Sequence, residues 1–494
     1  MERSAGILLS ITSLPSKYGI GCFSKEAYEF VDFLKRSGQT YWQILPIGPT
    51  SYGDSPYQSF STFAGNPYFI DLEQFIEAGI LTKEECDEVD FGTTDDIDYH
   101  KLYIGRYPLL KKAFKRSNIM EDPDFAEFVK QNEWLEDYSL FMAVKDKNDG
   151  VAWDEWDEDI KLRKPEALQQ YKDECSEEMC FYKFLQYHFY KQWNKLKAYA
   201  NENGVKIVGD IPIYVAFDSA DVWASPQLFQ INEDNVLKAV AGCPPDGFSA
   251  DGQLWGNPLY DWDYHKSTGF EWWISRIAFS FKMYDVVRID HFRGFDEYYS
   301  IPYGDKTAVN GHWEKGPGMD LFNAIEAALG KRDVIAEDLG FMTDTVRELV
   351  KDSGFPNMKV IEFAFDSRDS GCRNDYLPHN YGENCVAYTG THDNQTIISW
   401  FDTISDEEKQ MAREYLEDYD TPNDKINIPF INLIMNSKAN LCIIPMQDYL
   451  GLDDSCRMNQ PSTLGINWKW RVKKEALSDE MEKEILKITK QYNR

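Results

Sequence analysis

The sequence predicts an α/β fold, a (β/α)8 TIM barrel in which eight parallel strands close into a cylinder surrounded by helices. Two observations predict this fold. Short apolar runs recur along the 494 residues, as expected for strands that are buried on both faces. Segments with helical periodicity separate most of these runs, which is the alternation found in such barrels.

Eight apolar runs are the candidate strands. They are GILLSI (6–11), YWQILPI (41–47), KIVGDIPIYV (206–215), DVVRID (285–290), DVIAED (333–338), MKVIEF (358–363), CVAYTGT (385–391) and LCIIPMQD (441–448). Side chains alternate between the two faces of a strand, so each run also predicts which of its residues share a face.

Helical patterns follow several of these runs. Residues 24–37 carry apolar residues at helical spacing behind Ser24, a candidate N-cap. Residues 342–351 follow the fifth run, with Thr343 as the candidate cap. The last helix is expected near 474–492, where apolar residues form one stripe.

A single catalytic domain is predicted over residues 1–494, with insertions after the second and third strands. A mainly helical insertion is expected over roughly 73–200, because a connection of this length is too long for a loop and holds helix-like segments such as 176–202. A loop-rich insertion is expected over roughly 216–284. Its stretch GCPPDGFSADGQLWGNPLYDW (242–262) is rich in glycine, proline and aromatic residues and is interpreted as a long surface loop.

The composition excludes some classes of partner. The net charge of −31 repels phosphate backbones and anionic lipids, so neither a nucleic acid nor a membrane surface is expected as a partner. The nine cysteines are scattered, and no N-terminal signal peptide or bilayer-spanning run is present, so we expect free thiols in a reducing, cytoplasmic setting. No exposed helical seam indicates an oligomeric state.

Two candidate strands end in acidic residues. In VIAED (334–338), Glu337 and Asp338 point to opposite faces, so only one of them faces a cleft at the strand ends, and the spacing does not decide which. In DVVRID, Arg288 and Asp290 share a face. A neighbouring guanidinium lowers the pKa of a carboxylate and keeps it ionised, as a nucleophile requires.

Further acidic residues follow the third and seventh strands. Asp210 lies near the end of the third, and His392 and Asp393 lie just past the seventh. Because active sites of such barrels form at the carboxyl ends of the strands, these side chains are expected to meet at one mouth. For each aspartate considered alone, a helix cap or a turn former remains the alternative.

Other kinds of site are less well supported. His291, His392 and several aspartates could ligate a divalent ion, but the sequence has no HxH or HExxH spacing. GIGCFS (19–24) lacks the third glycine of a dinucleotide-binding loop. The Walker pattern GxxxxGK[ST] and the GxSxG elbow of serine hydrolases are both missing.

Eight motifs carry a family resemblance. They are SLPSKYGIG (13–21), SPYQSFSTFAGNPYFIDL (55–72), GDIPIYV (209–215), LWGNPLYDW (254–262), VVRIDHFRGF (286–295), AEDLG (336–340), YTGTHDN (388–394) and RMNQPSTLGINWKWR (457–471). In order and spacing the sequence closely resembles 4-alpha-glucanotransferases of the amylomaltase type, also called disproportionating enzymes. The resemblance covers nearly the whole chain, and residues 75–200 are its least distinctive part.

The resemblance implies a retaining mechanism on α-1,4-glucans such as maltooligosaccharides, starch and glycogen, with transfer to the 4-hydroxyl of another glucan or glucose. It implies that Asp290 is the nucleophile that forms a covalent glucosyl-enzyme intermediate. Glu337 would be the general acid and then the general base, and Asp393 would bind hydroxyls of the distorted sugar ring. The remaining matched residues would bind substrate: Asp210, Arg288 and His392 around the sugar at the cleavage point, and the aromatic Tyr57 and Trp255 along the cleft. No cofactor or metal is implied.

This chemistry sets physical requirements. The two carboxyl groups of a retaining pair lie about 5–5.5 Å apart, and adjacent strands, roughly 4.8 Å apart, can supply that spacing. The pKa of Glu337 should be raised, so that it is protonated for the first step, and the pKa of Asp290, which faces Arg288, should not.

Transfer also requires walls that exclude water, for which the 242–262 stretch with Trp255, Pro244 and Pro245 is the candidate. Two other functions are weighed: a plain α-glucan hydrolase with the same acids, and a non-catalytic glucan-binding protein, which the presence of all three acids disfavours. One departure from the family pattern is Gln395, where many relatives would have an acid after HDN.

Overall fold

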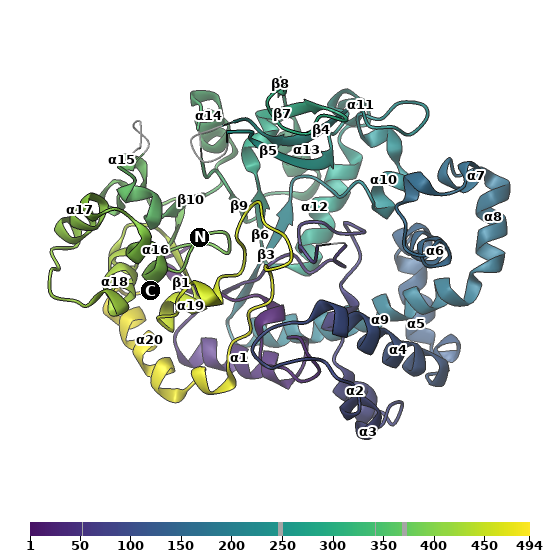
Figure 1. Ribbon diagram of the computed structural model, residues 1–494, viewed down its shortest axis with the longest axis horizontal. Helices are drawn as coiled ribbons and strands as arrows, with labels where there is room; N and C mark the ends of the chain where they lie inside the picture. The colour runs from purple at the N-terminus through teal and green to yellow at the C-terminus, as the bar shows by residue number, and fades with distance from the viewer. Residues whose placement is uncertain (52, 246–249, 341, 368–372) are drawn as a thin grey trace.

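The computed structural model confirms the predicted barrel (Figure 1). It describes residues 1–51, 53–245, 250–340, 342–367 and 373–494. Eight parallel strands close the barrel in the order β1-β12-β11-β10-β9-β6-β3-β2, and each overlaps the run predicted for it. The strands are β1 (Ser4–Leu8), β2 (Tyr41–Gln43), β3 (Lys206–Pro212), β6 (Val286–Asp290), β9 (Val334–Ala336), β10 (Asn357–Val360), β11 (Cys385–Tyr388) and β12 (Leu441–Pro445).

The alternation of side chains along the strands divides the core in two. One buried cluster takes a member from every barrel strand and fills the barrel: Leu8, Tyr41, Val208, Val286, Ile335, Met358, Val360, Val386, Tyr388, Leu441 and Ile443. The intervening residues, such as Ile207, Val287 and Ala336, belong to the larger cluster that packs the strands against the helices. The side chain of every second residue of a strand therefore points into the barrel, toward its axis. This alternation continues into the strand ends that form the mouth.

The predicted helices are present, with differences at their starts. Helix α1 (Lys25–Arg36) begins after Ser24, but this serine makes no side-chain capping bond; its hydroxyl instead lies 2.7 Å from that of Ser16 and 2.6 Å from the carboxylate of Glu26. Helix α14 (Asp344–Ser353) begins as expected, with Thr343 accepting from the backbone N–H of Val346. Helix α20 (Asp479–Gln491) starts later than the predicted 474, because Ser478 caps it.

The chain segment that connects β2 to β3 forms a group of helices, on the right in Figure 1. They are α2 (Leu72–Glu77), α3 (Lys83–Asp87), α4 (Tyr99–Arg116), α5 (Pro123–Gln131), α6 (Trp134–Lys147), α7 (Glu158–Lys161), α8 (Pro165–Glu174) and α9 (Ser176–Glu202). Helix α9 packs against α6, α4 and α1, so it joins this group to the ring of helices around the barrel.

Residues 216–284, where the sequence predicts a loop-rich insertion, contain regular elements: α10 (Ala220–Ala224), β4 (Ala239–Cys243), β5 (Gln253–Pro258), α11 (Trp262–Ser267) and α12 (Glu271–Met283). Strands β4 and β5 join β7 (Glu297–Pro302) and β8 (His312–Lys315) in an antiparallel sheet of order β5-β4-β7-β8. The interpretation of 242–262 as a long surface loop is therefore wrong, although residues 246–249 lie outside the described residues. The strands are short, and the register shifts between Val240 and Gly242, which hid their pattern.

The remaining helices complete the second half of the barrel. They are α13 (Met319–Leu329), α15 (Arg373–Tyr376), α16 (Ile397–Thr403), α17 (Asp406–Leu416), α18 (Asn427–Asn436) and α19 (Met446–Tyr449). Among the described residues, no helix is both long and apolar enough to span a lipid bilayer.

Candidate active site

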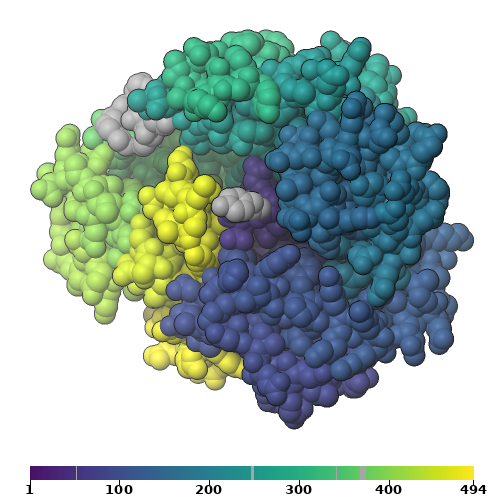
Figure 2. Space-filling model, turned by 45° about the vertical axis from the view of Figure 1, so that its right-hand side comes forward, coloured from purple at the N-terminus to yellow at the C-terminus, as the bar shows by residue number. Residues whose placement is uncertain are grey.

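A cleft of about 640 Å³ opens over the carboxyl ends of the barrel strands. Three segments that are distant in the sequence form its sides: residues 53–58, residues 252–257 and residues 459–468. The side chains of Asp290 and Asp393 also line it. Figure 2 shows the yellow C-terminal segment beside the hollow that opens between it and the blue and teal parts of the molecule.

Arg288 is the centre of a buried charge cluster inside the barrel. Its Nη1 lies 2.7 and 2.6 Å from the two carboxylate oxygens of Asp210, and its Nη2 lies 3.0 Å from Oδ1 of Asp290. These contacts follow from the strand register, in which Asp210 of β3 pairs with Arg288 of β6. As predicted, Arg288 and Asp290 share the inner face of their strand, because Val286 on that face belongs to the barrel interior.

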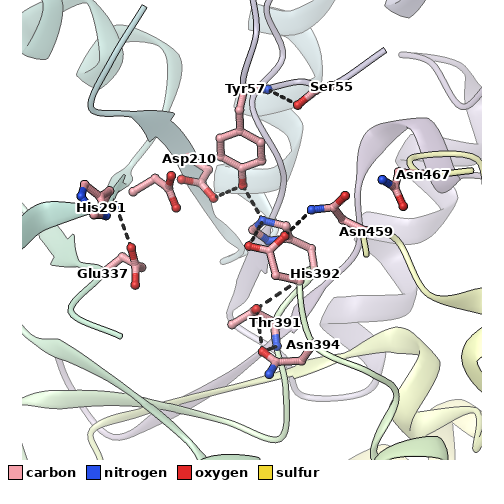
Figure 3. A network of polar contacts seen from close by, with 12 residues as sticks. Ser55, Tyr57, Asp210, His291, Glu337, Thr391, His392, Asn394, Asn459 and Asn467 are labelled. Atoms are coloured by element: carbon pink, nitrogen blue, oxygen red, sulfur yellow. Dashed lines mark hydrogen bonds and ion pairs between the residues drawn. The ribbon is translucent and has the colours of Figure 1, made fainter. Parts of the chain in front are cut away.

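A second part of the network runs from Asp210 to the loop that follows β11 (Figure 3). The hydroxyl of Tyr57 donates to Oδ2 of Asp210 at 2.8 Å and lies 2.9 Å from Nε2 of His392. The same Nε2 lies 3.3 Å from Oδ2 of Asp393. Five predicted site residues, Asp290, Arg288, Asp210, Tyr57 and His392, thus form one chain of polar contacts that ends at a sixth, Asp393.

Glu337 is placed beside Asp290 by the ladder between β6 and β9. Ile289 pairs with Ala336, and the next backbone N–H, that of Glu337, donates to the carbonyl of Ile289 at 3.1 Å. The carboxylate of Glu337 accepts from the backbone N–H of His291 at 2.6 Å and from that of Leu339 at 2.8 Å. Two amides from different strand ends therefore fix its orientation.

The structure settles which acid of VIAED belongs to the mouth. Ile335, on the same face as Glu337, lies in the barrel interior, whereas Ala336, on the face of Asp338, packs toward the helices. Asp338 is 7% exposed and accepts from the backbone N–H of Met358 at 3.0 Å. Glu337 is therefore the acid in the charge cluster, and Asp338 is a buried contact between strands.

The pKa values of Glu337 and Asp290 agree in part with the expectation from the sequence. Shielding from water and the nearby Asp290 raise the pKa of Glu337 to about 7, as predicted. Shielding also raises the pKa of Asp290 to about 6, although Arg288 lowers it. The expectation that Arg288 would prevent any rise is therefore wrong, because the loss of hydration outweighs the guanidinium. Arg288 contacts Asp290 directly, and Asp290 in turn raises the pKa of Glu337, so the pair favours a charge on Asp290 and a proton on Glu337, as a nucleophile and an acid require.

His392 and Asp393 have opposite shifts. Burial lowers the pKa of His392, but the contact with Asp393 outweighs this and raises the pKa overall. Burial raises the pKa of Asp393, but His392 and a hydrogen bond from Asn459 hold it well below its usual range. Asp393 is therefore ionised throughout the neutral range and presents a charged acceptor to the cleft.

Trp255 forms part of one cleft wall, as predicted for this stretch. Its ring meets that of His291 edge to face, with centroids 4.8 Å apart and an interplanar angle of 90°. His291 has a left-handed backbone conformation, φ 53°, at the point where the chain leaves β6. Pro244 and Pro245, the other candidates for this wall, are not among the residues that line the cleft.

Sequence reasoning missed three residues of the C-terminal segment. Nδ2 of Asn459 donates to Oδ1 of Asp393 at 2.6 Å. Nη2 of Arg457 donates to the backbone carbonyl of the same Asp393 at 2.6 Å. The ring of Trp468 packs against Tyr57 and His392, with centroids 5.9 and 6.0 Å apart. All three lie within the motif RMNQPSTLGINWKWR, which was the only signal for them.

Gln395 is not among the residues that line the cleft. Its amide donates to Asp454 at 2.8 Å, and its carbonyl oxygen accepts from Thr403 at 3.0 Å. Within the described ranges, no group of three or more His, Cys, Asp or Glu side chains is arranged to hold a metal ion.

Comparison with known proteins agrees with this site. A family model described as 4-alpha-glucanotransferase (Glyco_hydro_77) matches residues 9–477. The chain is 52% identical over 491 residues to a 4-alpha-glucanotransferase of Clostridium butyricum, covering 98% of this chain and 100% of the relative. It is 48% identical over 499 residues to one of Streptococcus pneumoniae, covering 100% and 98%.

Solved structures show the same likeness. The amylomaltase from Streptococcus agalactiae in complex with acarbose matches with a TM-score of 0.96 and 43% identity over 100% of both chains. The amylomaltase from Corynebacterium glutamicum shares the fold, with a TM-score of 0.80 at 19% identity, over 99% of this chain and 75% of that one. The resemblance seen in the motifs is confirmed, and the chain belongs to the 4-alpha-glucanotransferase family.

Proposed function

We propose that the chain is a 4-alpha-glucanotransferase that moves a segment of an α-1,4-glucan to the 4-hydroxyl of another glucan or of glucose. The observation that carries this proposal is the pair Asp290 and Glu337, held on adjacent strand ends with Arg288 in contact with Asp290. Two carboxyls so placed suit double displacement with retention of configuration. Its substrates are maltooligosaccharides and glucans of the starch and glycogen type.

The two displacements use the same two residues in reversed roles. Asp290 attacks the anomeric carbon while the protonated Glu337 gives its proton to the leaving glycosidic oxygen, which forms a covalent glucosyl-enzyme and a shortened glucan. Glu337, now a carboxylate, then removes the proton of the acceptor 4-hydroxyl as that oxygen displaces Asp290. The amides of His291 and Leu339 hold the carboxyl of Glu337 in place through both steps.

The rest of the polar network binds the sugar at the cleavage point. Asp393 is ionised and lines the cleft, so it can accept hydrogen bonds from two hydroxyls of the ring. Such bonds strengthen as positive charge develops at the anomeric carbon. Arg288 orients Asp290, and Asp210, Tyr57 and His392 hold one another through the contacts in Figure 3.

Transfer requires that a sugar hydroxyl reaches the intermediate before water does. Tyr57 and Trp255 line the cleft and offer apolar faces on which sugar rings can stack, and the buried Trp468 packs against Tyr57. An acceptor bound on these faces displaces water from the anomeric carbon. A plain hydrolase would use the same acids, so the distinction lies in the products.

Incubation with maltotriose separates the two reactions. A transferase yields glucose together with maltooligosaccharides longer than maltotriose, whereas a hydrolase yields glucose and maltose without longer chains. The products are resolved by anion-exchange chromatography over time, with Asp290→Asn as the inactive control. Absence of longer chains at every time would contradict the transferase, and turnover by Asp290→Asn within a few-fold of wild type would contradict the nucleophile assignment.

A further inference from the structure

The ladder between β9 and β10 is the shortest in the barrel. These strands are registered at a single pair, Asn357 with Ala336, whereas every other pair of neighbouring barrel strands has at least three registered pairs. Glu337 directly follows β9, and its backbone N–H donates to the carbonyl of Ile289 in β6. Beyond Ala336, the backbone of the segment that carries Glu337 is therefore bonded to the β6 side, and the pairing with β10 ends at Ala336.

The side chain of Asp338 bonds to the other neighbour. Its Oδ1 accepts from the backbone N–H of Met358 at 3.0 Å, and its Oδ2 accepts from Nδ2 of Asn357 at 3.1 Å. Both donors belong to β10. A buried carboxylate that accepts from two donors is a strong and directional contact. Asp338 thus extends the junction beyond the single registered pair.

The position of Asp338 in the chain connects its contact with β10 to Glu337. The carboxylate of Glu337 accepts from the N–H of Leu339, so Asp338 is the central residue of the turn that this bond closes. If residue 338 shifted away from β10, Leu339 would move with it, and the amide that orients the carboxylate would be displaced. Asp338 itself is 7% exposed and both of its carboxylate oxygens are bonded to β10, so it is not available to a substrate.

We propose that Asp338 is a positioning residue for Glu337: by tying the turn 337–339 to β10, it keeps the general acid and base aimed at the glycosidic oxygen. The inference rests on the role proposed above for Glu337. It differs from a general contribution to folding, since it predicts that only steps which use Glu337 are affected when Asp338 is changed.

The test compares two donors in the full-length enzyme. Maltotriose needs a proton on its leaving group, whereas α-maltotriosyl fluoride releases fluoride without one, so its first-turnover fluoride release reports Asp290 alone. For Asp338→Ala we expect kcat on maltotriose to fall by about 10–100-fold, with KM and first-turnover fluoride release changed less than about 3-fold. Asp338→Asn should stay within about 5-fold of wild type, because its amide oxygen still accepts from Met358 and its amide can donate to a flipped Asn357.

A double-variant cycle decides whether the effect passes through Glu337. If it does, Asp338→Ala combined with Glu337→Gln loses no more maltotriose activity than Glu337→Gln alone. Equal losses on both donors, losses that multiply in the double variant, or wild-type activity of Asp338→Ala would each overturn the proposal. Should Asp338→Ala fail to fold, Asn357→Ala, which removes only one donor, is judged by the same criteria, with an expected loss of about 3-fold on maltotriose.

The cycle also distinguishes the two levels of inference. If Glu337→Gln transfers maltotriose at the wild-type rate, the role proposed for Glu337 fails. If Glu337→Gln shows the loss expected of a missing acid but Asp338→Ala does not, only the positioning role of Asp338 fails.

Discussion

Arg288 binds Asp210 through a single nitrogen, with Nη1 at 2.7 and 2.6 Å from the two oxygens, which leaves Nη2 free to reach Asp290 at 3.0 Å. One planar group thus sets the position of a buried carboxylate and of the proposed nucleophile at the same time. A lysine would keep the charge but could not hold both in a fixed geometry.

Arg288→Lys should therefore lower kcat on maltotriose by about 10²–10³-fold. The weaker contact with Asp290 should also raise the pKa of that carboxyl further, so the acidic limb of the pH profile of kcat/KM should move to higher pH. Steady-state rates between pH 4 and 9 check both effects. A profile with an unshifted acidic limb would show that Arg288 does not control the ionisation of Asp290.

The strands, and the shared face of Arg288 and Asp290, could be predicted because burial on both sides leaves near-continuous apolar runs and side chains alternate along a strand. That alternation also showed that Glu337 and Asp338 lie on opposite faces. It could not show which face is the interior, because this depends on the ladder with β6 and on the packing of Ile335 against other strands.

The roles of Asn459 and Trp468 could not be predicted from local patterns, since their partners Asp393 and Tyr57 lie far away in the sequence. The antiparallel sheet was missed for a related reason. Its strand β4 contains Gly242 and a register shift, and it pairs with β7, which lies beyond the fourth barrel strand. Such pairing is decided by tertiary contacts, which outweigh the local propensity.

Glu337→Gln should reduce transfer from maltotriose by about 10²–10⁴-fold, because the leaving oxygen no longer receives a proton. The glutamine has nearly the same shape, but its single oxygen can accept from only one of the amides of His291 and Leu339, which bond to different oxygens of Glu337. With a glycosyl fluoride donor the covalent intermediate should still form, and it should accumulate because no general base activates the acceptor. Mass spectrometry of the quenched enzyme detects it. A donor that releases fluoride but leaves no adduct would argue against the covalent step.

The activity should depend on pH as a bell-shaped curve. Asp290 must be ionised, and its pKa of about 6 sets the acidic limb. Glu337 must be protonated, and its pKa of about 7 sets the alkaline limb. kcat/KM for maltotriose should therefore be highest between these values. First-turnover fluoride release should keep the acidic limb and lose the alkaline one. An alkaline limb that persists with the fluoride donor belongs to another group.

The raised pKa of Glu337 also predicts that this carboxyl lowers the stability of the folded protein as the pH rises. Between its ordinary pKa of 4.5 and about 7, the folded protein binds a proton that the unfolded chain has lost. The contribution of this group to stability is thus fully present below pH 4.5 and is lost as pH rises through 7. Because Glu337→Gln cannot ionise, its stability relative to wild type should be higher at pH 8 than at pH 5 by about 1–3 kcal/mol. Denaturant unfolding at both pH values measures the difference. An equal gain at both would indicate a cause other than ionisation.

Asn459 holds the carboxylate of Asp393 through a bond of 2.6 Å and belongs to the C-terminal segment that lines the cleft. Asn459→Asp keeps the shape but replaces the donor with a second carboxylate, and two like charges at this distance raise one of the two pKa values. We expect kcat/KM on maltotriose to be about 10²-fold below wild type at pH 7.5, and this deficit relative to wild type to shrink near pH 5, where the pair shares a proton. Asn467→Asp is the matched control, because Asn467 also lines the cleft but bonds to Gln460 and Thr463. A loss that is equal at pH 5 and pH 7.5 would mean that Asn459 acts on the shape of the segment and leaves the charge of Asp393 unchanged.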